Sequence, residues 1–334
     1  MKDAYIPMTT QIDTPRHSLD DSNDSEARDA DAVLVLGMHR SGTSALTRVL
    51  NLLGVELGGS LMRAAASNET GFWEHQDVVD IHAALLKALG MTWDDPRRLP
   101  DGWLASDAGR DAAAALLARL SGDFANASLW GVKDPRMCRF LPLWQEVLAT
   151  LGTKPGYVIL LRHPLEIVRS LHQRNHMTTS RGLLLWLRYT LEAEAGTRES
   201  PRVLVRYGDL MGNWKPVATR ISGALGISLD LKSRKAAAAI KSFIRPSMRH
   251  YSLDAGALAE DQRLKHWAGE AHQALETAAD GNTSGLADTL DRISSEVDLA
   301  GYYFDETLAE AAPREARLAE EIHDLHTRLH EREK

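Results

Sequence analysis

The segment from Val33 to Leu46 constrains the fold of this chain more than any other part of the sequence. It reads VLVLGMHRSGTSAL, so an apolar strand runs into a turn bounded by Gly37 and Gly42 and then into a helix. A turn of this kind directs backbone N–H groups and the positive end of a helix at one point, where an anion binds. The segment predicts a phosphate-binding loop, and the alternative is a turn whose glycines serve geometry alone.

The loop differs from the nucleotide-triphosphatase motif G-x-x-x-x-G-K-[ST] at its most informative position. The spacing of the two glycines is kept, but Thr43 stands where that motif has its lysine, and the cationic side chain lies inside the loop at Arg40. The loop therefore predicts an anionic ligand other than a magnesium-bound triphosphate.

Composition limits the classes of protein to which the chain can belong. With 334 residues, 44% of them hydrophobic and 25% charged, it can bury a sizeable core. A net charge of -7 argues against a nucleic-acid partner, although a local basic cleft could bind a small polyanion. The single cysteine, Cys138, excludes an intrachain disulfide and fits a cytoplasmic location. We expect neither a secretory signal nor a membrane span.

Three further apolar runs end in polar residues. We expect strands at 129–132, 157–161 and 202–206, and helices at 43–53, 111–120 and 183–195. This alternation predicts an α/β fold: a three-layer P-loop-like domain with a mostly parallel central sheet flanked by helices. The carboxyl ends of such strands form the edge where open α/β sheets bind ligands.

The two ends of the chain differ from its centre. Residues 1–31 are polar and acidic, which predicts a flexible tail, and residues 32–304 form the expected catalytic domain. Residues 305–334 form an expected C-terminal helix that starts at Pro313. Its apolar residues, Leu318, Ile322, Leu325 and Leu329, have the spacing of a short coiled coil, which predicts self-association. A helix that packs on its own domain fits the same spacing.

These motifs together resemble those of sulfotransferases that use 3′-phosphoadenosine 5′-phosphosulfate (PAPS). GMHRSGTSAL resembles their 5′-phosphosulfate loop, and Arg162 followed by Ser170 resembles their 3′-phosphate motif. WGVKDPR, which contains Lys133, is similar to an element of tyrosylprotein sulfotransferases, and ASNETGFWEH to a segment of bacterial sulfotransferases. Many family members have lysine where this loop has Arg40. The resemblance spans 33–210, and the agreement in order and strand context makes it specific.

The resemblance implies which residues hold the donor. The 5′-phosphosulfate would lie against the loop, whose residues in this chain are Gly37, His39, Arg40, Ser41, Gly42, Thr43 and Ser44. Arg162 and Ser170 would hold the 3′-phosphate, or instead form an ordinary ion pair and a solvated hydroxyl. Tyr207 would pack near the nucleotide or serve as a plain core tyrosine. His39 also fits a structural role.

The resemblance also implies a metal-free in-line displacement with 3′-phosphoadenosine 5′-phosphate (PAP) as the product. Arg40 and Lys133 would neutralise the bridging and sulfuryl oxygens, where negative charge builds. The acceptor hydroxyl needs a base, and the candidates are Glu74 and then His75. A solvent-facing or helix-capping Glu74 and a surface Lys133 are the structural alternatives. The expected acceptor is a carbohydrate.

Two other functions fit the sequence. An ATP-dependent small-molecule kinase also begins with a phosphate loop, and Asp134 offers it a strand-end carboxylate for magnesium. A non-catalytic nucleotide-binding scaffold, assembled through the C-terminal helix, fits as well. A basic turn around Arg245, Arg249 and His250 would close over an anion or remain a solvated loop.

Overall fold

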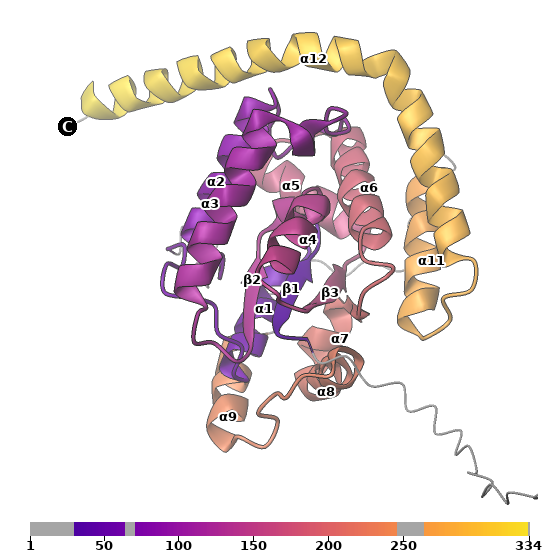
Figure 1. Cartoon of the computed structure of the whole chain (residues 1–334). Coiled ribbons are helices and arrows are strands. Elements are labelled where there is room, and N and C mark those ends of the chain that lie inside the picture. Colours follow the sequence, from indigo (N-terminus) through magenta and orange to yellow (C-terminus); the bar gives the residue numbers. More distant parts are fainter. Residues whose placement is uncertain (1–29, 64–70, 246–263, 333–334) are drawn as a thin grey trace, which may run out of the picture.

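The computed structural model describes residues 30–63, 71–245 and 264–332 (Figure 1). Four parallel strands form one sheet in the order β2-β1-β3-β4. The strands are β1 (Ala32–Leu36), β2 (Trp130–Lys133), β3 (Pro155–Leu161) and β4 (Arg202–Arg206). All four strands predicted from apolar runs are therefore present, with ends that differ by at most two residues.

Helices follow and separate the strands along the chain. They are α1 (Thr43–Leu52), α2 (Gln76–Ala88), α3 (Asp107–Asp123), α4 (Leu141–Thr150), α5 (Pro164–Asn175), α6 (Thr179–Ala195), α7 (Tyr207–Gly212), α8 (Trp214–Leu225), α9 (Arg234–Phe243), α11 (Glu270–Ala279) and α12 (Leu286–Arg332). Short 3-10 turns, η1 (Trp103–Ala105) and η2 (Pro135–Cys138), and a π-helical turn at Lys265–Gly269 complete the described elements.

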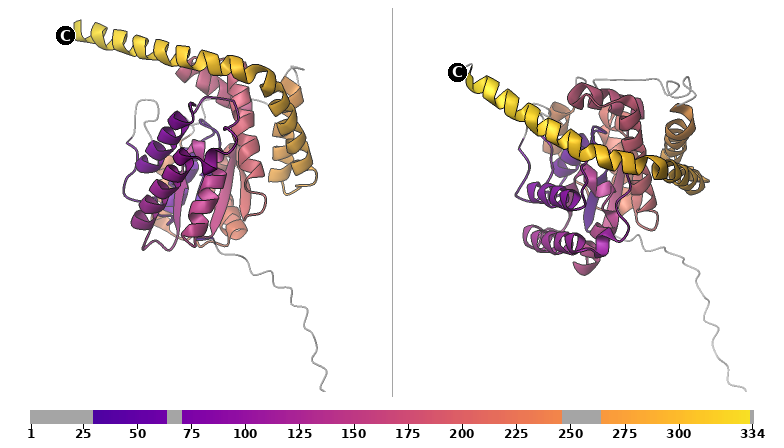
Figure 2. Two further views of the ribbon diagram at one scale, coloured as in Figure 1. Left: turned by 45° about the horizontal axis from the view of Figure 1, so that its top comes forward. Right: turned by 90° about the horizontal axis from the view of Figure 1, so that it is seen from above.

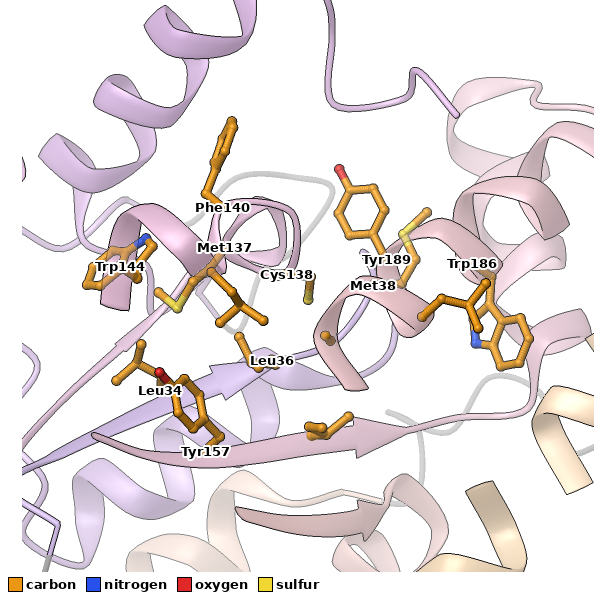
Figure 3. Close-up of a cluster of buried hydrophobic side chains, with 14 of the residues drawn as sticks. Leu34, Leu36, Met38, Met137, Cys138, Phe140, Trp144, Tyr157, Trp186 and Tyr189 are labelled. Carbon is orange, nitrogen blue, oxygen red and sulfur yellow. The ribbon is translucent and has the colours of Figure 1, made fainter. Parts of the chain in front are cut away.

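The side chains of each strand alternate between two cores, because successive residues of a strand point to opposite faces of the sheet. Leu34 and Leu36 face a core that contains residues of α2 to α6, α11 and the start of α12, whereas Val33 and Val35 face residues of α1, α8 and α9. Figure 3 shows part of the first core, where Trp144 and Tyr189 lie above the sheet. The predicted three-layer α/β architecture is confirmed.

The sequence-based expectations differ from the structure at both ends. Ala30 is buried and its N–H donates to the carbonyl of Leu225 at 3.1 Å, so the last residues of the predicted tail are ordered. The rest of that tail lies outside the described residues. At the other end, α12 starts at Leu286 rather than Pro313, because Leu290, Ile293 and Val297 pack into the first core.

The long helix α12 crosses the predicted domain boundary at 304/305 without interruption. The helix has 47 residues. Its first part packs beside α11 and α6, where Asp298 accepts from Arg188 at 2.8 Å. It then runs over the top of the molecule and projects past the other helices (Figures 1 and 2). Phe304, Leu318 and Ile322 are exposed by 62%, 55% and 54%, so this part of α12 leaves apolar side chains in solvent.

Candidate active site

The loop between β1 and α1 has the backbone of an anion-binding turn. Gly37 and Gly42 have φ values of 151° and 93°, and Arg40 adopts the left-handed region at 69°. No side chain of the described residues caps the start of α1, so the first N–H groups of the helix are left to a ligand or solvent. The predicted strand, loop and helix are thus present in the predicted order.

Both glycines of the loop lie so close to neighbouring side chains that a Cβ at either position would clash with them. A Cβ added to Gly42 would lie 2.3 Å from the ring of Tyr207, and one added to Gly37 would lie 3.0 Å from Thr43. The Gly37 N–H also donates to the Cys138 Sγ at 3.2 Å. Tyr207 therefore packs directly against the loop and joins the end of β4 to it.

Arg40 connects the loop to the predicted 3′-phosphate residues. Its Nε donates to the Ser170 Oγ at 2.8 Å, while Nη1 of Arg162 donates to the Arg40 carbonyl at 2.9 Å. The Arg162 guanidinium lies 4.7 Å from the centre of the Tyr207 ring. Burial lowers the pKa of Arg40, and the positive charges of Arg174 and Arg162 lower it further. Arg40, Arg162, Ser170 and Tyr207 thus form one group.

Arg162 also forms the ion pair that was the structural alternative for it. Its Nε donates to the Glu166 Oε2 at 2.8 Å, one turn along α5, and both side chains are buried. This bond fixes the guanidinium beside the loop. It uses Nε, while Nη1 binds the loop backbone, so the ion pair orients Arg162 toward the loop.

Lys133 and Glu74 form a buried ion pair next to the loop. The Lys133 ammonium donates to the Glu74 Oε1, to the Ser44 Oγ at 3.2 Å and to the Phe72 carbonyl at 3.4 Å. Both side chains are over nine-tenths buried. Burial raises the pKa of the Glu74 carboxyl above its usual range, and the charge of Lys133 offsets part of that effect. The surface and capping alternatives for these two residues are therefore not observed.

His75 lies apart from this pair although it follows Glu74 directly. Its Nε2 lies 2.7 Å from the Asp123 Oδ2 of α3, and its ring packs against Phe124. His75, Asp77 and Asp123 have ligand atoms within 4.8 Å of one another, but the guanidinium of Arg119 pairs with Asp77 at 3.2 Å and lies 3.7 Å from Asp123. An arginine already supplies the cation of this cluster.

His39 is a buried residue of the loop. Its ring lies 4.6 Å from that of Trp93 and 5.9 Å from that of Tyr189. Burial lowers the pKa of His39 well below its usual value, so the imidazole is neutral at pH 7. Its Nε2 has no hydrogen-bond partner among the described residues. A neutral imidazole with one open nitrogen can donate to or accept from a ligand.

Asp134 anchors a chain of buried polar side chains that the sequence did not predict. Its Oδ2 lies 2.8 Å from the His82 Nδ1, and its Oδ1 accepts from the Nε of Arg136 at 2.9 Å. The Trp144 Nε1 donates to the other nitrogen of His82 at 2.9 Å. Burial opposes the charge of Asp134, but Arg136 and His82 keep the pKa of this carboxyl below its usual range. Both carboxylate oxygens are therefore already bonded.

The structure thus gathers most of the predicted residues at the carboxyl edge of the sheet. The loop follows β1, Lys133 ends β2, Arg162 follows β3 and Tyr207 follows β4. Of the basic turn, Arg245 is described and its Nε donates to the Ser242 carbonyl at 3.2 Å. Arg249 and His250 lie outside the described residues.

Comparisons with known proteins match this chain to solved structures. No family model matches the chain, and no curated protein does. Among solved structures, the chain is similar to the sulfotransferase domain of the Synechococcus PCC 7002 olefin synthase, with 18% identity, 76% of this chain and 90% of that chain covered, and a TM-score of 0.39. The chain is also similar to the sulfotransferase STF1 of Mycobacterium tuberculosis H37Rv, with 12% identity, 68% of this chain and 75% of that chain covered, and a TM-score of 0.36. For the sulfotransferase domain of the curacin biosynthetic pathway, the identity is 15%, the coverage is 79% of this chain and 96% of that chain, and the TM-score is 0.39.

These identities and TM-scores are too low to carry an argument about activity or substrate. The functional conclusion therefore depends on the residues of the site. Within the described ranges, no helix is both long enough and apolar enough to cross a membrane.

Proposed function

We propose that this chain is a sulfotransferase that moves a sulfuryl group from PAPS to an acceptor hydroxyl. The observation that carries the proposal is the meeting of the Arg40 loop, the Arg162–Ser170 pair and the Lys133–Glu74 pair at one edge of the sheet. The loop backbone and the uncapped start of α1 suit the 5′-phosphosulfate. Arg162 and Ser170 suit the 3′-phosphate, because a guanidinium and a hydroxyl both donate to a doubly charged oxyanion.

The proposed reaction is a displacement at sulfur. The acceptor oxygen forms a bond to sulfur, the bond from sulfur to the bridging oxygen breaks, and PAP leaves with the electron pair. Lys133, next to Ser44 at the start of α1, and Arg40 stabilise the charge that builds on these oxygens. Glu74 takes the acceptor proton, because burial raises the pKa of its carboxyl toward the range that suits a base near neutral pH.

The proposed acceptor is a carbohydrate hydroxyl, which follows from the resemblance to bacterial sulfotransferases. Cys138 is a buried free thiol, which supports the proposed cytoplasmic location. We also propose that α12 brings two copies together, because its exposed apolar residues need a partner surface.

The kinase alternative loses its best candidate for a magnesium ligand. Asp134 is fully buried, and its two oxygens accept from Arg136 and bond to His82. A carboxylate that is closed in this way is not placed to coordinate a metal between phosphates. The scaffold alternative predicts no sulfuryl transfer, so a turnover assay distinguishes it from the proposal.

The test is incubation with sulfur-labelled PAPS and a panel of glycans, lipids, phenols and tyrosine peptides, followed by mass measurement of the products. We expect a labelled glycan in the presence of a chelator. Arg40→Ala should lower kcat by about 10²- to 10³-fold, which is the usual effect of losing one oxyanion donor. The matched control is Arg234→Ala, an exposed arginine at the start of α9, which should leave turnover unchanged. Near-normal turnover in folded Arg40→Ala protein would reject the assignment.

A further inference from the structure

The outer part of α12 has an apolar face that is open to a second molecule. Phe304, Leu318, Ile322 and Leu325 are each more than half exposed. This part of the helix projects past the other helices (Figures 1 and 2), so a partner can reach it from the side. An apolar face that repeats every seven residues on a long helix is typical of a coiled coil.

The sequence of α12 defines the two flanks of this apolar face. The core positions run from Phe304 to Leu329 at alternating intervals of four and three residues. The flank that precedes every second core position, heptad position g, consists of Thr307, Arg314, Glu321 and Arg328. The opposite flank, heptad position e, consists of Asp305, Ala312, Ala319 and His326. Side chains at e and g meet those of the partner helix, so their charges decide how two helices align.

A parallel pair of these helices suits this sequence poorly. Each core position would meet itself, so Glu315 would lie opposite Glu315 of the second copy, and two carboxylates in an apolar seam repel each other. Across the flanks, each g position would meet the e position five residues further on. Arg314 would then meet Ala319, and the one charge match within the repeat would join Glu321 to His326.

An antiparallel pair in which the whole repeat overlaps avoids the contact between two glutamates. Phe304 of one helix then lies beside Leu329 of the other, and each Glu315 lies opposite Leu318. Ala311 lies opposite Ile322, so a small core side chain meets a large one. Every core layer thus contains at least one large apolar residue.

The same antiparallel pair matches charges on both flanks. Reversal of one helix brings g positions opposite g positions and e positions opposite e positions. Arg314 therefore meets Glu321 of the second copy, and Asp305 meets His326. Because the pair has twofold symmetry, each of these contacts forms twice.

A shift of the antiparallel pair by one heptad removes this match. In one direction, Glu321 meets Glu321 and Arg314 meets Arg328. In the other direction, Arg314 meets Arg314. Like charges across a flank destabilise a coiled coil. The charge pattern thus favours one register as well as one direction.

We propose that two copies of this chain pair through α12 in the antiparallel direction, with Phe304 of one copy beside Leu329 of the other. The segment between these residues is about 38 Å long at a rise of 1.5 Å per residue, so the two domains lie at its opposite ends. This inference rests on the self-association proposed above and adds the direction and the register of the pair.

Disulfide formation between full-length cysteine variants tests the direction, because the native Cys138 is buried. Leu308→Cys and Leu325→Cys are purified separately, mixed, and equilibrated in a glutathione redox buffer. We expect the disulfide between positions 308 and 325 to be at least tenfold more abundant than either self-disulfide, as measured by peptide mass spectrometry. Glu310→Cys, an exposed position outside the repeat, is the matched control and should cross-link with neither variant.

A parallel pair gives the opposite result in this experiment. Positions 308 and 325 would then lie about 25 Å apart along the axis, and each variant would cross-link with itself. A predominance of self-disulfides would therefore overturn the inference.

A charge exchange tests the register without a change in the core. Glu321→Arg places an arginine opposite Arg314 at both contacts and should raise the dissociation constant of the dimer at least threefold. The double variant Arg314→Glu/Glu321→Arg should restore it to within twofold of the wild-type value. Equal dissociation constants in all three proteins, measured by sedimentation, would overturn the proposed register.

Two further measurements separate this inference from the proposals on which it builds. A wild-type protein that stays monomeric at high concentration would reject the self-association, and with it the antiparallel pair. Sulfuryl transfer from PAPS is assayed independently, so its absence would reject the proposed reaction without a change in the cross-linking result.

Discussion

At the scale of single residues, the site combines buried charges with partners that orient them. Glu74 and Lys133 are paired away from solvent, and Asp134 closes a chain of hydrogen bonds below Arg136. A buried charge is tolerated only with such partners, because the loss of hydration is otherwise too costly. Among the described residues, no side chain caps the start of α1, so its first N–H groups remain for a ligand at the loop.

The raised pKa of Glu74 predicts the pH dependence of turnover. A base must be unprotonated, so kcat should rise with pH as the carboxyl loses its proton, above the usual carboxyl range. Glu74→Gln should remove this limb of the profile and lower kcat by about 10²- to 10⁴-fold. His75→Gln is the matched comparison, and we expect it to keep the limb because His75 bonds to Asp123. If the pH profile of kcat changes in His75→Gln but not in Glu74→Gln, His75 rather than Glu74 is the base.

At the scale of elements, the sequence predicted the sheet well and the site contacts poorly. Each strand is a run of apolar residues that ends in a polar one, and this signal is local. The bond between Arg40 and Ser170 joins residues 130 positions apart, and that between Lys133 and Glu74 joins residues 59 positions apart. Such contacts depend on which strands are neighbours, and this order cannot be read from any one segment.

The residues that sequence reasoning missed had weak local signals. Arg136 stands two residues after Asp134 in WGVKDPR, a motif in which Lys133 carries the resemblance, and Arg174 stands one turn after Ser170. Trp93 lies in a loop, where an aromatic residue has no periodic pattern to mark it. The start of α12 was missed because a proline that fits a first turn also occurs within this helix.

Two buried histidines connect α5 to α11 and predict a pH-dependent stability. The ring of His163, the N-cap of α5, lies 4.9 Å from that of His272. Burial lowers the pKa of each to about 4; the charge of Arg206 also acts on His272, while Glu166 opposes the shift in both. Unfolded histidine titrates near pH 6.5, so between about pH 6.5 and 4 the unfolded state binds more protons and the free energy of unfolding falls as pH falls.

Denaturant unfolding at pH 7 and pH 5 measures this effect. We expect the pair to account for a loss of about 2 to 4 kcal/mol at pH 5. His272→Phe should remove about half of that loss, because the variant has one such group fewer. The control is His266→Phe, which changes an exposed histidine and should keep the wild-type difference. The same pH difference in all three proteins would contradict the assignment.

At the scale of the whole molecule, the outer part of α12 leaves apolar side chains exposed, among them Phe304, Leu318 and Ile322, because no other described element packs on them. One series of positions along α12 has intervals that alternate between four and three residues, as the core positions of a coiled coil do. The series consists of Phe304, Leu308, Ala311, Glu315, Leu318, Ile322, Leu325 and Leu329. The repeat is thus longer than the segment after Pro313 suggested. Glu315 is the one charged residue at these positions, and such a residue restricts how two helices align.

We expect the full chain to form a dimer through this repeat, measured by light scattering over a range of concentrations. Ile322→Glu places a second charge in the core positions and should give a monomer without changing the fold of residues 30–300, as judged by circular dichroism. Glu310→Gln, an exposed change outside the repeat, is the control and should leave the dimer intact. A monomeric wild-type protein at high concentration would reject this use of α12.

The order of the strands also affects how the chain is made. The donor loop depends on β1, which pairs with β2 and β3, and residues 37–154 separate it from β3. At a synthesis rate of roughly 5–20 residues per second, β1 waits on the order of ten seconds before β3 leaves the ribosome. For most of that time, until β2 (Trp130–Lys133) is made, the apolar segment 32–36 has neither neighbouring strand. The anion-binding turn therefore cannot be completed during synthesis until β2 and then β3 have been made and have paired with β1.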